Sequence, residues 1–133
     1  MSTSDGGSAP RRALIVEDSA FVRRIMRARL EQAGWEVTEA QDPDEGWRIF
    51  QTVQPQLLTL DIVMPGAEKF DSLGLFRRIR ARAPEVAVIV VSVSSSGHDR
   101  DKFMREGAIA FASKPFVDFD RILAQVNARL SST

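Results

Sequence analysis

The stretch Ala13-Leu14-Ile15-Val16-Glu17-Asp18 decides the fold, because four consecutive apolar residues end at two carboxylates. A continuous apolar run, rather than an alternating one, is typical of a β-strand that is covered on both faces. Such strands occur in parallel sheets that have helices on either side. We therefore expect residues 13–16 to form a buried strand, with Glu17 and Asp18 at its carboxyl end.

The rest of the chain repeats this pattern of a short apolar run followed by an amphipathic stretch. Further strands are expected over residues 36–40, 57–60, 86–91 and 109–112. Helices are expected from an N-cap at Ser19 to Gly34, and over residues 43–53, 73–82, 98–106 and 118–130. Five strand-helix units predict an α/β fold, a doubly wound five-stranded parallel sheet, because right-handed crossovers place helices on both faces.

The composition limits the classes of function. Eighteen basic and eighteen acidic residues cancel, so no global field attracts nucleic acid or a membrane surface. The absence of cysteine excludes disulfides and thiolate metal sites, and it fits a cytoplasmic location. Residues 1–10 are rich in Ser and Gly and are expected to be a disordered tail, with one domain over residues 11–133. No apolar run has the length of a membrane span.

Polar side chains follow the expected strands at their carboxyl ends. They are three carboxylates, a hydroxyl and an ammonium: Glu17, Asp18, Asp61, Ser92 and Lys114. Ligands of parallel sheets bind beyond the carboxyl ends of the strands, so these side chains are expected to converge. Three neighbouring carboxylates repel one another unless a cation joins them, and Mg²⁺ suits a site of few carboxylates, water and phosphate. The sequence therefore predicts a site for Mg²⁺ and a phosphoryl group.

Five motifs along the chain occur in the order found in one protein family. They are Leu14-Ile15-Val16-Glu17-Asp18-Ser19, Leu60-Asp61-Ile62-Val63-Met64-Pro65, Val90-Val91-Ser92, Gly107-Ala108 and Lys114-Pro115-Phe116. On these motifs the chain resembles the receiver domains of two-component response regulators, of the single-domain chemotaxis CheY type. The resemblance implies a flavodoxin-like sheet with strand order 2-1-3-4-5 and a receiver domain over residues 11–133.

The resemblance implies that Asp61 is the phosphorylation site. Asp61 would attack the phosphorus of a phosphohistidine on a partner kinase and become an acyl phosphate. Mg²⁺ would be held by the carboxylates of Asp18 and Asp61 and by the main-chain carbonyl of Val63. Glu17 would help directly or through water.

The resemblance also implies residues that sense the phosphoryl group and set its lifetime. Ser92 would donate its hydroxyl to the group, and Lys114 would pair with Asp61 or with phosphoryl oxygens. Phe111 would turn inward on activation, although core packing is the default for an aromatic residue in a strand. Val63 and Ser94 occupy positions that tune how fast the acyl phosphate hydrolyses.

The implied function is signalling rather than catalysis of a metabolic reaction. The expected partners are the phosphotransfer domain of a histidine kinase, a phosphatase and, by resemblance to CheY, the flagellar motor switch. The face of the fourth helix, fifth strand and fifth helix would carry the output of a monomer that binds neither nucleic acid nor membrane. A DNA-binding role is not expected because nothing that could bind DNA follows the receiver. A phosphate sink, or a regulator of another signalling partner, is the alternative.

Two other classes are disfavoured by single positions. A haloacid-dehalogenase-like phosphohydrolase needs a second Asp two residues after its nucleophile, and Val63 holds that place. A flavodoxin-like nucleotide or flavin module needs a glycine-rich phosphate loop after the first strand, where Glu17 and Asp18 stand instead.

Three other features keep two readings. The Arg-rich segment 23–27 is either a solvated helix face or part of the kinase docking surface. His98, the only histidine, is expected to be solvated or to cap a helix. Residues 65–72 are about three residues longer than the turn usual in the family, with Ser72 in place of glycine, and this length either alters access to Asp61 or is inert.

Overall fold

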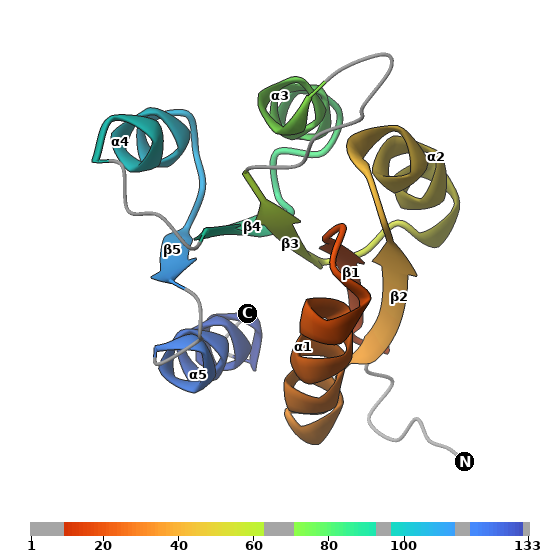
Figure 1. The fold of residues 1–133 in the computed structure, drawn as a ribbon. Coiled ribbons are helices and arrows are strands. Elements are labelled where there is room, and N and C mark those ends of the chain that lie inside the picture. The colour runs from red at the N-terminus through yellow and green to blue at the C-terminus, as the bar shows by residue number, and fades with distance from the viewer. Residues whose placement is uncertain (1–9, 63–70, 93–96, 114–117, 132–133) are drawn as a thin grey trace.

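The structure is a computed structural model that describes residues 10–62, 71–92, 97–113 and 118–131. Strands and helices alternate through this part of the chain (Figure 1). The strands are β1 (Arg12–Val16), β2 (Glu36–Ala40), β3 (Leu57–Asp61), β4 (Ala87–Ser92) and β5 (Ala110–Ser113). The helices are α1 (Ala20–Gln32), α2 (Pro43–Val53), α3 (Ser72–Arg82), α4 (Gly97–Arg105) and α5 (Phe119–Ser131). Each expected element is present, and its ends differ from the prediction by at most two residues.

The strands form one parallel sheet in the order β2-β1-β3-β4-β5, which confirms the predicted α/β class and strand order. Its register aligns the carboxyl ends of the central strands, with Val16 opposite Leu60 and Asp61 opposite Val91. The chain order reverses between β1 and β3, and ligands bind parallel sheets at such a point. The residues that follow β1 and end β3 therefore meet at one edge.

Helices cover both faces of the sheet, as the continuous apolar strands require (Figure 1). Helices α2, α3 and α4 pack on one face and α1 and α5 on the other. Alternate residues of β1 point to opposite faces, so Leu14 and Val16 belong to the first core and Ala13 and Ile15 to the second. Among the described residues, no helix is both long and apolar enough to span a membrane.

Short polar side chains fix where the helices begin. Ser19 caps α1, as predicted, by accepting a hydrogen bond from the main-chain N–H of Val22 at 3.2 Å. Helix α3 begins at Ser72, one residue before the predicted start, because Asp71 caps it by accepting from the N–H of Gly74 at 2.9 Å. That extra residue places the Ser72 side chain against the end of β3.

Candidate metal and phosphoryl site

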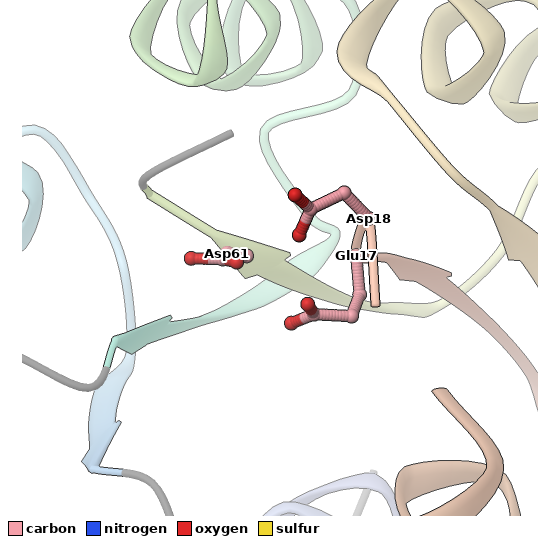
Figure 2. Close-up of side chains that lie close together, drawn as sticks. All are labelled: Glu17, Asp18 and Asp61. Carbon is pink, nitrogen blue, oxygen red and sulfur yellow. The ribbon is translucent and has the colours of Figure 1, made fainter. Parts of the chain in front are cut away.

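Three carboxylates meet where β1 and β3 end. Glu17 and Asp18 follow β1 and reach toward the end of β3, where Asp61 lies (Figure 2). One carboxylate oxygen from each residue lies within 4.8 Å of the others. The prediction that strand ends bring these three residues together agrees with the geometry.

The three carboxylates differ in exposure. Glu17 and Asp61 are 1% and 5% exposed, whereas Asp18 is open to solvent. Charged oxygens removed from water need a compensating positive charge or hydrogen bonds. Within the described residues, the cluster is therefore buried at Glu17 and Asp61 and exposed to solvent at Asp18.

The donor set fits a hard divalent cation. Three carboxylates with an oxygen each inside one 4.8 Å group suit Mg²⁺, which prefers a few carboxylates together with water and phosphate. These three acidic side chains, all within the described residues, lie close enough together to share one ion. Glu17, Asp18 and Asp61 are the side chains that would hold it.

Two hydrogen bonds to main-chain carbonyls hold the cluster, and the residues that make them were not predicted. The Arg23 guanidinium donates to the carbonyl of Glu17 at 2.7 Å. The Ser72 hydroxyl donates to the carbonyl of Asp61, also at 2.7 Å. The Glu17 carboxylate itself accepts a hydrogen bond from the N–H of Ser19 at 3.1 Å. The main chains of Glu17 and Asp61 are thus tied to α1 and α3.

Arg23 belongs to an ionic network that joins α1 to β2. It donates to Glu39 at 2.9 Å, and Arg27 donates to the other oxygen of Glu39 at 2.6 Å. The Arg27 hydrogen bond, followed by that of Arg23, holds the pKa of Glu39 below its ordinary value, against the opposing effect of burial. The segment 23–27, for which docking or solvation was expected, therefore also has a structural role through these two arginines.

The structure places only some of the other predicted residues. Ser92 is buried at the end of β4, next to β3, and lies opposite Ser113 in the register of β5. Phe111 is half-buried against the core under α4, with the Arg100 guanidinium 5.8 Å from its ring centre. Lys114, Val63 and Ser94 lie outside the described residues, as does most of segment 65–72. His98 lies in the first turn of α4.

Comparisons with known proteins identify relatives of this domain. A family model described as the response regulator receiver domain matches residues 13–127. A probable transcriptional regulator, ycf27, of Cyanophora paradoxa is 33% identical over 80% of this chain and 43% of its own length. A protein-glutamate methylesterase/protein-glutamine glutaminase of Symbiobacterium thermophilum is 33% identical over 98% of this chain and 38% of its own length. The chain therefore spans less than half the length of these two relatives.

A solved structure supports the same fold. The crystal structure of a CheY-like response regulator receiver domain protein from Methanospirillum hungatei matches 93% of this chain and 96% of its own chain. The TM-score is 0.80 and the sequence identity 24%, so this likeness concerns the fold.

Proposed function

The chain belongs to the response regulator receiver domain family, and on that premise we propose that Asp61 accepts a phosphoryl group from the phosphohistidine of a histidine kinase. The observation that carries the proposal is the convergence of Glu17, Asp18 and Asp61 within 4.8 Å at the carboxyl edge of the sheet. Two of these carboxylates are almost fully buried. Burying carboxylates costs free energy, and clusters of this kind are typical of functional sites.

The proposed reaction is an in-line displacement at phosphorus. A carboxylate oxygen of Asp61 forms the new P–O bond as the P–N bond to the kinase imidazole breaks, and the imidazole leaves with the bonding electron pair. Bound Mg²⁺ supplies positive charge to the carboxylates and to the phosphoryl oxygens. The carboxylates of Asp18 and Asp61 and the carbonyl of Val63 would hold it, with Glu17 helping directly or through water, while Ser92 and Lys114 would bind phosphoryl oxygens.

The signal leaves the site through the face of α4, β5 and α5. Movement of Ser92 toward the phosphoryl group frees space into which Phe111 turns. Phe111 already packs partly against the core, so its rotation changes the surface between α4 and β5. Arg100 lies over the ring and would have to move with it.

We propose a chemotaxis role for this receiver, with the flagellar motor switch as its output partner. The support is the resemblance to the CheY type, carried by the motifs at the strand ends. Residues 11–133 act as the receiver behind the tail of residues 1–10, as a cytoplasmic monomer that works without nucleic acid. The alternative output is a phosphate sink or another signalling partner. The ycf27 relative is named as a transcriptional regulator, so control of transcription through a further domain or partner is a third outcome to test.

The first experiment tests Asp61. The wild-type protein, Asp61→Asn and the control Asp101→Asn are incubated with Mg²⁺ and either a phosphorylated histidine kinase or acetyl phosphate. Asp101 is an exposed acidic residue on α4, so its substitution changes charge by the same amount away from the cluster. Label is expected in the wild type and the control and absent from Asp61→Asn. Equal labelling of all three, or of none with any donor, would contradict the proposal.

The second experiment tests the output. Binding to a purified motor switch protein is measured with and without beryllofluoride and Mg²⁺, which mimic the phosphorylated state. Tighter binding in the presence of the adduct is expected. If the affinity for the motor switch protein is the same with and without the adduct, the motor switch is ruled out as the output partner, whereas the proposed role of Asp61 is unaffected.

A further inference from the structure

The Ser72 hydroxyl contacts the proposed phosphorylation site but has no role in the proposed reaction. It donates to the main-chain carbonyl of Asp61 at 2.7 Å, and both residues are buried, at 4% and 5% exposure. A hydrogen bond of this length in a buried setting fixes both groups, because neither can exchange it for water.

The ladder between β1 and β3 explains why Asp61 needs this donor. The last pair in that ladder joins Val16 to Leu60, one residue before Asp61. On the other side, β3 remains tied to β4, since the N–H of Ile62 donates to the carbonyl of Val91 at 3.1 Å. Asp61 thus lies just past the last residue pair of the ladder with β1, and there the Ser72 hydroxyl donates to its buried carbonyl.

The donor comes from an element that cannot easily move. Ser72 is the first residue of α3, whose start is fixed by the Asp71 cap. Leu75, Phe76 and Ile79 of the same helix are fully buried in the core on this face of the sheet. The main chain of Asp61 is therefore anchored to a packed helix.

We infer that Ser72 is a positioning residue for Asp61. By holding the Asp61 carbonyl, it fixes the backbone conformation that directs the Asp61 carboxylate. The inference rests on the proposed function of Asp61. With the carbonyl fixed, the Asp61 carboxylate stays inside the group that it forms with Glu17 and Asp18. Loss of the hydroxyl lets this carboxylate drift, which weakens Mg²⁺ binding and slows phosphoryl transfer.

The same bond bypasses the lengthened connection between Asp61 and α3. It joins the two ends of that connection directly, across residues 62–71. The family's usual glycine at this place has no side chain that could make such a bond. Ser72 thus links Asp61 to α3 by a hydrogen bond that a glycine at this position would not make.

The test compares variants in a measurement that needs no phosphodonor. The Mg²⁺ dissociation constant is measured by calorimetry for the wild type, Ser72→Ala and Ser72→Thr. Removing a group that orients a metal ligand typically weakens metal binding by about 10-fold or more, and we expect Ser72→Ala to do so. Threonine keeps the hydroxyl, so Ser72→Thr is expected to stay close to the wild type.

Two controls separate positioning from general stability. Val126→Ala removes buried volume from α5 on the opposite face and destabilises the fold without touching the end of β3. Thr52→Ala removes an exposed hydroxyl from α2. Both are expected to keep the wild-type Mg²⁺ affinity and the wild-type rate of labelling by acetyl phosphate. Ser72→Gly, which also lacks the hydroxyl, replaces Ser72→Ala if the latter does not fold.

The inference is overturned if Ser72→Ala keeps both the Mg²⁺ affinity and the labelling rate of the wild type. It is also overturned if Val126→Ala lowers them equally, or if Ser72→Thr loses as much as Ser72→Ala. Its failure is distinct from failure of the proposed function. A wild type that no donor labels on Asp61 contradicts the proposed function, whereas a loss of Mg²⁺ affinity in Ser72→Ala would still stand.

Discussion

At the scale of single residues, two of the residues that would do chemistry, Glu17 and Asp61, are held by neighbours that have no part in it. The carboxylates of Glu17 and Asp61 are nearly buried, and the carbonyls of the same two residues accept hydrogen bonds from Arg23 and Ser72. Preorganisation of this kind removes the cost of ordering the reacting groups at the moment of phosphoryl transfer. The acidic site is thus built by two helices as much as by the strands that carry it.

The residue that follows Asp61 by two positions is expected to set how long the phosphorylated state lasts. An apolar Val63 can neither orient a water molecule toward the acyl phosphate nor receive a polar group from a phosphatase. Val63→Asn is therefore expected to hydrolyse several-fold faster, because its amide can orient the attacking water. The measurement is the decay of labelled protein after the donor is removed, and an unchanged decay rate would show that Val63 has no such role.

The acidic cluster could be predicted from sequence, whereas the residues that hold it could not. Glu17, Asp18 and Asp61 stand at the ends of apolar runs, so knowing that the sheet is parallel is enough to bring them together. The contact of Ser72 with Asp61 depends on where α3 starts and how it packs. The only signal in the sequence was a serine in place of the family's glycine.

At the scale of elements, helices α1 and α2 are each followed by a residue with positive φ, a glycine after α1 and a glutamine after α2. The chain leaves α1 through Gly34 at φ +96°, where a Cβ would meet no other atom within 4 Å. It leaves α2 through Gln54 at φ +53°, a left-handed conformation that costs a residue with a Cβ about 1–2 kcal/mol. The two positions therefore form a matched pair.

Exchanging glycine and side chain at these ends should shift stability in opposite directions. Gly34→Ala is expected to lower the free energy of unfolding by about 1 kcal/mol through backbone strain alone. Gln54→Gly should raise it by up to about 1 kcal/mol, less the entropy that glycine adds to the unfolded chain. Urea denaturation measures both changes. Shifts of the same sign would contradict backbone strain as the cause.

The network between α1 and β2 should make stability depend on pH. Arg27, and then Arg23, hold the pKa of Glu39 below its ordinary 4.5, so the ionised carboxylate is favoured in the folded state. This contribution is complete above pH 4.5 and is lost as the pH falls through the lower folded value.

Glu39→Gln tests the sign of this dependence. At pH 7 the variant is expected to be less stable than the wild type by about 0.5–1 kcal/mol, the range of partly exposed ion pairs. The gap should close as the pH falls below 4.5, because the wild type then loses the same interaction. Glu36→Gln is the control, since Glu36 is an exposed residue of the same strand. A gap that is constant from pH 7 to pH 3 would contradict the assignment.

The strands and helices could be predicted from the sequence, and the residues at which they begin and end show why. Four strands are mostly apolar runs, β2 is a more polar strand at the sheet edge, and the helices have clear caps or stops, so the ends of every element were expected within two residues of their places. Helix α3 starts one residue earlier than expected, because Asp71 and Ser72 both resemble ordinary loop residues. The choice between them depends on the hydrogen bond from Gly74 to the Asp71 side chain, which forms only once the helix exists.

At the scale of the whole molecule, a site of three like charges opposes the stability of the fold that carries it. The cluster joins the ends of β1 and β3, two neighbouring inner strands of the sheet, so repulsion within it acts between them. A bound cation removes this repulsion and adds its own binding free energy to the folded state. Stability and function should therefore respond in opposite ways to the loss of one charge.

Asp18→Asn tests whether the loss of one charge raises the stability of the ion-free fold while it weakens cation binding. Asp18 is the exposed member of the cluster, so the amide replaces a carboxylate without changing buried packing. In EDTA the variant is expected to melt a few degrees above the wild type, since it loses about 0.5–1 kcal/mol of repulsion between partly solvated charges. In millimolar Mg²⁺ the wild type should gain stability and the variant should gain little, because the site has lost a ligand. Thermal melts of both proteins across a Mg²⁺ series decide the matter. A variant that is less stable than the wild type in EDTA would contradict the repulsion within the cluster. A variant that gains as much stability from Mg²⁺ as the wild type would contradict the role of Asp18 in a cation site.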